Sequence, residues 1–242
     1  MSDRTFQPFE SLLGRVREGE IERWRDLEAE FLSATEHFDE EYRAGNRETG
    51  WYQSKARYFN DIVVGLLVNN THCDIAARAK KDSHLFGKID IDICCPKKGE
   101  PLVAGETKAL GTPPHPRNKN KGRPGSQDLH KRIREVAFTS MDLKAAYAKA
   151  RTISSFQGWI DSTEPGYFSF WAVRVDTARD LERVREMLSG LRNYCNGVGA
   201  VIYGPTDPTR PVSYVVHTVP HLSMDAPIRE MAQRIVGRPD RA

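Results

Sequence analysis

Acidic and basic side chains recur at close spacing on two short apolar segments, between residues 87 and 108. In the first segment Asp90 and Asp92 alternate with isoleucines, and in the second Glu106 and Lys108 stand two residues apart. Carboxylates that gather in one place repel each other, so they are stable together only with a cation. Their hard oxygen atoms favour Mg²⁺, for which Mn²⁺ can substitute, over Zn²⁺. With a lysine beside the ion, this set of side chains predicts chemistry at a phosphoryl group.

These side chains converge only if the two segments pair as strands. In residues 88–95 isoleucines at every second position alternate with polar residues, which predicts a strand. The three isoleucines should share one face, and Asp90 and Asp92 the other. The turn PKKGE follows, and residues 101–109 return as the second strand of a hairpin. The glutamate and the lysine of this second strand then point to one face as well.

The rest of the chain predicts an α/β fold with a mixed sheet. Apolar residues recur at helical spacing in the first third, and short apolar strands alternate with helices later. We expect the order ααββαβαββα. The expected helices cover residues 19–42, 51–69, 127–150, 178–194 and 225–236, and the remaining strands cover 167–175, 200–203 and 213–219. Residues 111–126 are rich in Gly, Pro, Asn and basic side chains without an apolar anchor, which predicts a long exposed loop.

Length and composition indicate a globular protein. The 242 residues include 39% hydrophobic and 29% charged residues, which suits one domain with a real core. The longest apolar run, Ile62–Val68, is far shorter than the roughly 20 residues that span a bilayer, so no membrane partner is expected. The first ten residues lack the apolar stretch of a secretory signal, and the 4 cysteines are too sparse for a disulfide scaffold. These features predict a cytoplasmic protein.

Charge is distributed unevenly along the chain. Residues 1–50 carry 13 acidic side chains against 7 arginines, whereas residues 108–151 carry 11 lysines and arginines against 3 acidic side chains. A basic surface of this kind is typical of proteins that bind a polyanion such as nucleic acid. Basic side chains contact phosphates, and Arg and Asn also read base edges. The candidate DNA-contacting residues are Arg117, Asn118, Lys119, Asn120, Lys121, Arg123, Lys131, Arg132 and Arg134.

Together these residues resemble the active site of the PD-(D/E)xK nuclease superfamily, whose members share the restriction-endonuclease-like fold. The motif is carried by Asp90 or Asp92 and by Glu106-Thr107-Lys108. The predicted order of helix, strand, strand, helix and strand is similar to the superfamily's α-β-β-β-α-β core. The resemblance therefore implies a mixed central β-sheet flanked by helices.

The resemblance also implies a role for each residue. Asp92 or Asp90 would hold Mg²⁺ together with Glu106 and the scissile phosphate, and the carbonyl of Thr107 would supply a further oxygen. Lys108 would position the attacking water and help to stabilise the transition state. Which aspartate is the main ligand stays open, because isoleucine precedes both.

Two further parts of the chain enter the hypothesis. Superfamily members often add a carboxylate or an amide from the helix before the hairpin, which here carries Gln53, Asn60 and Asp61. The acidic, apolar-striped residues 1–50 are expected to form a helical segment ahead of a nuclease core over residues 51–242. Because cleavage of both DNA strands usually needs two active sites, we expect a homodimer, with this segment as a candidate interface.

The function expected from these features is Mg²⁺-dependent hydrolysis of DNA phosphodiester bonds by a type II restriction endonuclease that acts on double-stranded DNA. One alternative keeps the fold but acts on structured or modified DNA, as a repair, recombination or phage-defence nuclease. Another is a catalytically inactive DNA-binding module.

Overall fold

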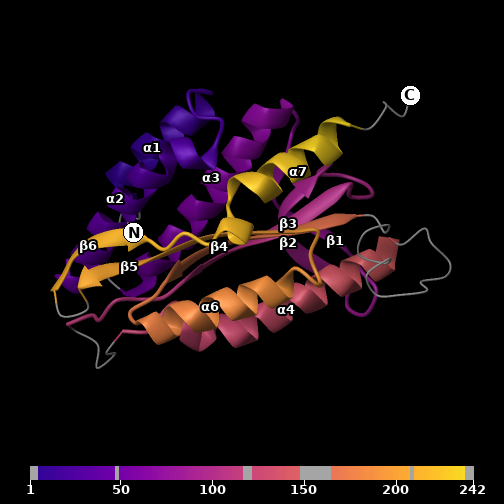
Figure 1. Ribbon diagram of the computed structural model, residues 1–242. Helices are drawn as coiled ribbons and strands as arrows, with labels where there is room; N and C mark the ends of the chain where they lie inside the picture. Colours follow the sequence, from indigo (N-terminus) through magenta and orange to yellow (C-terminus); the bar gives the residue numbers. More distant parts are fainter. Residues whose placement is uncertain (1–4, 47–48, 117–121, 148–164, 208–209, 238–242) are drawn as a thin grey trace.

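A six-stranded sheet lies between two layers of helices in the computed structural model, which describes residues 5–46, 49–116, 122–147, 165–207 and 210–237 (Figure 1). The helices are α1 (Gln7–Arg17), α2 (Trp24–Arg43), η1 (Thr49–Tyr52), α3 (Gln53–Thr71), α4 (Gly125–Tyr147), α6 (Ala178–Leu191), η2 (Pro220–Leu222) and α7 (Asp225–Val236). The strands are β1 (Ala76–Ser83), β2 (Gly87–Cys95), β3 (Val103–Leu110), β4 (Gly166–Arg174), β5 (Gly197–Asp207) and β6 (Arg210–Val216). No helix in the described ranges is long and apolar enough to cross a bilayer.

The strands lie in sequence order across the sheet, from β1 to β6. The central strands β3, β4 and β5 are parallel, whereas β1, β2 and β6 pair antiparallel with their neighbours. Parallel neighbours need crossover connections, and α4 and α6 supply them on one face of the sheet. Helices α1, α2, α3 and α7 cover the other face (Figure 1). The α/β class with a mixed sheet is thereby confirmed.

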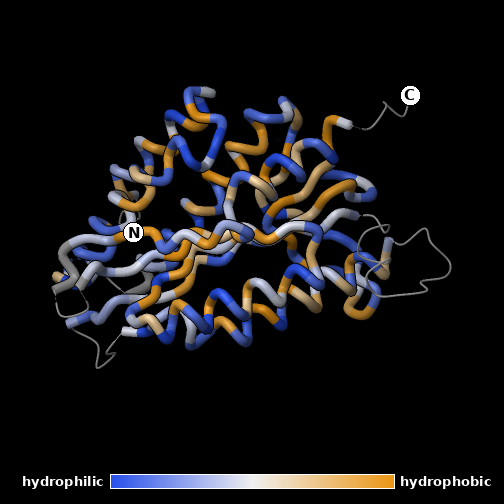
Figure 2. The backbone as a smooth tube through the Cα atoms, viewed as in Figure 1, coloured by the Kyte–Doolittle hydropathy of each residue, from blue (hydrophilic) through white to orange (hydrophobic). Residues whose placement is uncertain are grey.

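Each face of the sheet has its own apolar core. The core under α1, α2, α3 and α7 is rich in aromatic rings, among them Trp24, Phe31 and Phe59. The core under α4 and α6 includes Tyr167 and Trp171. In Figure 2 the hydrophobic segments run through the sheet and along the inner sides of the helices, as expected for elements that bury one face.

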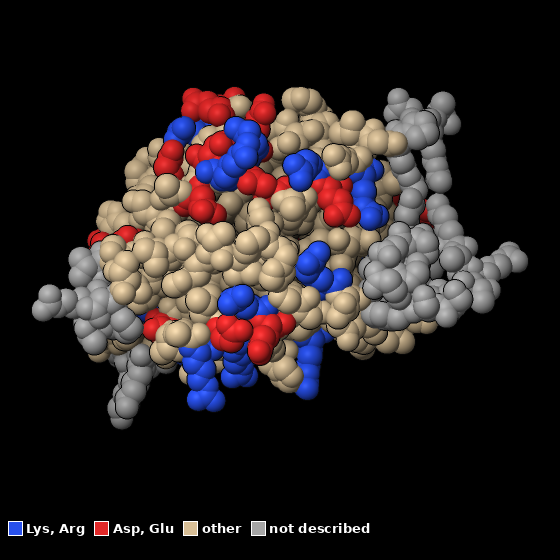
Figure 3. Space-filling view, viewed as in Figure 1, with Lys and Arg blue, Asp and Glu red and all other residues tan. Residues whose placement is uncertain are grey.

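The N-terminal helices belong to the first of these cores. Stacked rings of Phe9 and Tyr58, 5.0 Å apart, join α1 to α3, and the rings of Trp24 and Phe59 join α2 to α3 at 5.8 Å. The apolar stripe that we considered as a dimer interface is therefore buried within the chain itself. Helix α1 lies within the helical segment expected over residues 1–50, but it was not predicted as a separate helix. On the face shown in Figure 3, acidic side chains over α1 and α2 have basic side chains among them, and the lysines and arginines that project below the sheet lie beside a further acidic patch.

Strand β1 was not predicted either. Its sequence, AARAKKDS, is made of alanine and charged residues, which are poor strand formers, and it lies at the edge of the sheet, where one side is left without a partner strand. Lys81 is buried nevertheless, because its ammonium donates to the carbonyls of Pro96, Lys97 and Gly99 in the turn after β2. The edge strand thus stabilises the turn that joins β2 to β3.

The other predicted elements are confirmed, with ends that shift by a few residues, but two details are wrong. Ile91 packs into the core beside α4, whereas Ile93 packs into the core beside α3, so β2 changes face across Asp92 and the isoleucines do not share one face. The segment 111–126 is also not exposed throughout, because Pro113 and His115 are buried.

Candidate active site

Strands β2 and β3 separate at the position of the predicted site. They pair only between Ile93–Cys95 and Val103–Gly105, and β3 continues without β2 beside it. The main-chain N–H of Thr107 donates instead to Oδ2 of Asp92 at 3.1 Å. In an extended strand the N–H and the C=O of one residue point to the same side, so the carbonyl of Thr107 faces the same gap. The carboxylate thus takes the place of a strand carbonyl.

Lys108 lies between two carboxylates. Its ammonium forms an ion pair with Oε2 of Glu106 and lies 3.9 Å from Oδ2 of Asp92. Glu106 is buried, and its other oxygen accepts a hydrogen bond of 2.8 Å from the hydroxyl of Tyr167 in β4. Glu106 and Lys108 share one face of β3, as the alternation predicted. One ammonium therefore compensates only part of the charge of two carboxylates from adjacent strands.

Burial shifts the pKa of two groups at this site, Asp92 and Tyr167. It raises the pKa of Asp92, against the opposing effects of the Lys108 ammonium and the Thr107 N–H. It also raises the pKa of the Tyr167 phenol, and the charge of Glu106 adds to that effect, so the phenol stays a neutral donor. Because burial makes the ionised form of Asp92 unfavourable, a further cation beside it would stabilise that form.

A cleft of about 320 Å³ opens beside these residues. Four basic side chains from four different elements line it, while Asp92 is the single acidic side chain among the described residues of its wall. Its lining residues are Gln53, Ala56, Arg57 and Asn60 of α3, Arg78 of β1, Asp92 of β2, Thr107, Lys108, Ala109 and Leu110 of β3, and Arg132 of α4. The excess of positive charge suits an anionic ligand.

The helix before the hairpin contributes an amide to the cleft. Asn60 is 4% exposed, and its Oδ1 accepts a hydrogen bond of 3.1 Å from the hydroxyl of Thr107. Its Nδ2 has no acceptor among the described residues. Gln53 also lines the cleft, whereas Asp61 does not. A buried amide N–H₂ without an acceptor is costly, and a ligand oxygen in the cleft would satisfy it.

The structure separates the two aspartates that the sequence left as alternatives. The side chain of Asp90 is 83% exposed, lies 3.8 Å from the ammonium of Lys80, and does not line the cleft. Asp92 is the one that meets Glu106 and Lys108, because the change of face in β2 turns it towards β3.

The predicted DNA-contacting residues have different positions. Residues 117–121, which include Arg117, Asn118, Lys119, Asn120 and Lys121, lie outside the described residues. Arg132 lines the cleft and hydrogen-bonds Glu135 at 2.7 Å. Arg123, Lys131 and Arg134 are exposed outside the cleft.

Two basic residues of the cleft were missed by the sequence analysis. Arg57 follows Gln53 by four residues and precedes Asn60 by three, so helical periodicity would have placed it on the same face of α3. Arg78 carried no such signal, because its strand was not recognised.

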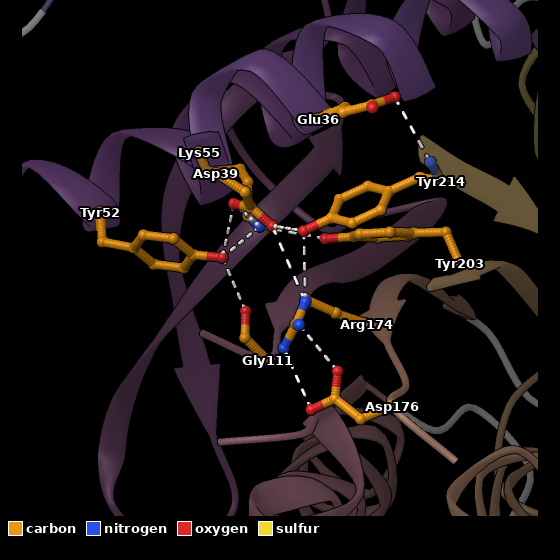
Figure 4. A network of polar contacts seen from close by, with 9 residues as sticks. All are labelled: Glu36, Asp39, Tyr52, Lys55, Gly111, Arg174, Asp176, Tyr203 and Tyr214. Atoms are coloured by element: carbon orange, nitrogen blue, oxygen red, sulfur yellow. Dashed lines mark hydrogen bonds and ion pairs between the residues drawn. The ribbon is translucent and has the colours of Figure 1, made fainter. Parts of the chain in front are cut away.

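A buried polar network holds α3 against the end of β3 (Figure 4). Its centre is Asp39 of α2, which is fully buried and accepts hydrogen bonds from Lys55 at 3.1 Å and from Tyr214 at 2.7 Å. The hydroxyl of Tyr52 lies 3.0 Å from Asp39 and 2.7 Å from the carbonyl of Gly111, immediately after β3. The network therefore fixes the position of α3, which forms one wall of the cleft.

The network is also charged. Burial lowers the pKa of Lys55, while the contact with Asp39 opposes that effect. Arg174 of β4 lies 4.0 Å from Asp39 and forms an ion pair of 2.7 Å with Asp176. Because removal of one partner of a buried ion pair leaves the other charge uncompensated, this arrangement tolerates little displacement of α2 and α3.

The donor atoms in the gap between β2 and β3 fit a small, hard cation. In the described part of the chain no three acidic, His or Cys side chains converge, so a cage made wholly of side chains is absent there. Mg²⁺ is commonly held by one or two carboxylates together with water and substrate phosphate, which matches Asp92, Glu106 and the carbonyl of Thr107. Lys108 compensates part of the negative charge of Asp92 and Glu106, and a bound ion would compensate more of it.

Comparison with protein-family models, with curated proteins and with solved structures gives no match for this chain. A functional assignment therefore depends on the contacts described above. They comprise two carboxylates and a lysine at a strand divergence, beside a cleft with basic walls.

Proposed function

We propose that this chain is a Mg²⁺-dependent deoxyribonuclease of the PD-(D/E)xK type, and that it acts as a type II restriction endonuclease on double-stranded DNA. The observation that carries the proposal is the convergence of Asp92, Glu106 and Lys108 where β2 and β3 separate. The basic residues of the cleft suit a substrate whose reacting group is a phosphodiester.

The order of elements supports the same proposal. Helix α3, the antiparallel strands β1, β2 and β3, the crossover helix α4 and the parallel strand β4 follow one another in the chain. This is the α-β-β-β-α-β order that the resemblance implies, and β1 supplies the strand that was missing from the sequence prediction.

Each residue has a distinct part in the proposed hydrolysis. A bond forms between a water oxygen and phosphorus, and one P–O ester bond breaks. The attacking water releases a proton to solvent and the leaving oxygen takes one from solvent, so the protons balance. Asp92 and Glu106 would hold a divalent cation, which stabilises negative charge on the phosphate oxygens when it is bound. Lys108 holds the attacking water in place and donates to the developing charge.

Double-stranded DNA, a homodimer and a cytoplasmic location belong to the proposal. Because the apolar stripes of α1 and α2 are buried within the chain, the dimer would use another surface. Light scattering of the protein with and without DNA tests this part, and a monomer in both samples contradicts it.

The experiment incubates the protein with plasmid DNA in Mg²⁺ or EDTA and resolves the products on a gel. Glu106→Gln keeps the size of the side chain and removes its charge, and Glu182→Gln is the control, because Glu182 is an exposed carboxylate of α6. We expect discrete fragments only in Mg²⁺, from the wild type and Glu182→Gln.

The other outcomes decide between the alternatives. A smear of fragments that depends on Mg²⁺ would still indicate a nuclease, but one of the repair, recombination or phage-defence class rather than a restriction endonuclease. If the plasmid stays intact, the assay is repeated with branched and modified DNA. A protein that binds these substrates but never cleaves them is the inactive DNA-binding module. Cleavage by Glu106→Gln at the wild-type rate would refute the assigned site.

A further inference from the structure

Arg78 has an unusual backbone conformation opposite Asp92. The β1–β2 ladder pairs Ala77 with Ile93 and Ala79 with Ile91, and Arg78 and Asp92 face each other between these pairs. The φ angle of Arg78 is 76°, in the left-handed region that residues other than glycine rarely adopt.

This conformation breaks the alternation of β1. Ala76 and Ala79, three residues apart, are both buried in the core beside α4, and Ala77 and Arg78 between them are both exposed. The result is that Arg78 lines the cleft beside Asp92. Strain of this kind persists only where the surrounding structure imposes it, and it is concentrated at functional sites.

The guanidinium of Arg78 has no internal partner that would explain the strain. Within the described residues it forms no hydrogen bond and no ion pair, although its charge helps to lower the pKa of Asp92 against the larger effect of burial. Asn60 also lines the cleft, and its Nδ2 is buried and lacks an acceptor among the described residues. Two residues of the cleft wall, from different elements, therefore carry donors that no described group uses.

We propose that Arg78 and Asn60 form a phosphate subsite that binds the non-bridging oxygens of a nucleic-acid backbone phosphate beside the carboxylates. The proposal rests on the proposed nuclease function and adds to it the residues that hold the substrate. Arg78 supplies charge and Asn60 supplies a neutral hydrogen bond, so their contributions are separable.

The first test compares Arg78→Gly with Ala77→Gly, an adjacent exposed residue for which no positive φ is recorded. Glycine relieves the strain at Arg78, so we expect the melting temperature to rise by about 2–4 °C in Arg78→Gly and to fall in Ala77→Gly. Plasmid cleavage should fall at least about tenfold in Arg78→Gly and stay at the wild-type rate in Ala77→Gly. A purely structural arginine would not combine higher stability with lower activity.

The second test measures binding of a labelled duplex of about 30 base pairs in EDTA, by fluorescence anisotropy at about 50 to 200 mM KCl. Loss of one phosphate contact should reduce the slope of log Kobs against log[salt] by about 0.9 in Arg78→Gly. Asn60→Ala should weaken binding without a change in slope, because the amide is uncharged.

The outcomes separate this inference from the proposed function. If the wild type cleaves plasmid and Arg78→Gly has the same cleavage rate and the same salt slope as the wild type, the subsite is overturned and the nuclease proposal stands. If the wild type binds DNA but cleaves neither plasmid nor branched or modified DNA, the nuclease proposal fails, and the salt slopes alone decide the subsite. A wild type that neither cleaves any of the DNA substrates nor binds the duplex overturns both.

Discussion

The main-chain N–H of Thr107 donates to Oδ2 of Asp92 at 3.1 Å, across the point where β2 and β3 stop pairing. This bond ties the position of the carboxylate to the divergence of the strands. If the two strands paired further, the Thr107 N–H would bond a main-chain carbonyl, and Asp92 would lose its partner. The opening of the sheet and the placement of the acidic group are therefore one feature.

Asp92→Asn should abolish metal-dependent cleavage and stabilise the fold at neutral pH. Asparagine keeps an acceptor for Thr107 and removes the charge that burial disfavours. Because the pKa of Asp92 is raised in the folded state, the folded protein binds more protons than the unfolded chain between the unfolded and folded pKa values. The wild type therefore loses stability as pH rises through that window, and the variant lacks this loss.

Thermal melts of both proteins from acidic to neutral pH measure the difference. The variant should melt higher than the wild type above the window, and the two curves should converge below it. A gap that widens towards acid would contradict the raised pKa of Asp92.

Lys108→Met should separate metal binding from cleavage. The substitution removes the ammonium between Asp92 and Glu106, so the two carboxylates repel each other until a cation replaces it. We expect a lower melting temperature without metal, a larger rise on addition of Mn²⁺ than in the wild type, and a cleavage rate at least about a hundredfold lower. Lys80→Met, at an exposed position of β1, is the control. Equal Mn²⁺-induced shifts in Lys108→Met and the wild type would argue against a metal at this pair.

Arg132→Ala and Arg134→Ala should differ, although both residues lie on α4. Arg132 lines the cleft, whereas Arg134 is exposed outside it. Loss of Arg132 should weaken binding of duplex DNA and reduce the salt slope by about one, and loss of Arg134 should leave both close to the wild type. Titrations at several salt concentrations measure this, and equal slopes for the two variants would mean that DNA does not enter the cleft beside α4.

Asp39→Asn should destabilise the fold strongly. It leaves the Lys55 ammonium buried without its carboxylate, at a cost of about 3–5 kcal/mol, which corresponds to a fall in melting temperature of about 10 °C. The double variant Asp39→Asn with Lys55→Met removes both charges and should recover part of the loss. Denaturant unfolding of the single and double variants gives the coupling energy, and strictly additive effects would show that the pair is not coupled.

The sequence predicts the hairpin well because its signals are local. Isoleucines at every second position identify β2, and the glutamate and lysine two residues apart in β3 share a face for the same reason. The change of face at Asp92 accompanies the irregularity at Arg78, which lies on a strand whose alanines and lysines give no alternation. Residues that line one cleft only because of the tertiary fold, such as Arg78 and Asn60, could not be grouped from the sequence.

Asp39 shows the same limit for the buried network. It follows the apolar period of its helix without standing out from the other acidic residues nearby. Tyr214, which donates to Asp39, and Tyr203, whose hydroxyl accepts from Lys55, come from strands at the other end of the chain. Nothing in the spacing of these residues predicts that they meet.

The two sets of contacts also differ in when the chain can form them. Asp92 and Thr107 are 15 residues apart, whereas Asp39 and Tyr214 are 175 residues apart. Closure of a short loop is fast, and a long-range contact must wait for its distant partner. On the ribosome the acidic hairpin therefore emerges complete while α3 still lacks the tyrosines that fix it. If the chain acts as the proposed nuclease, this order delays completion of the cleft until Tyr214 has been synthesised.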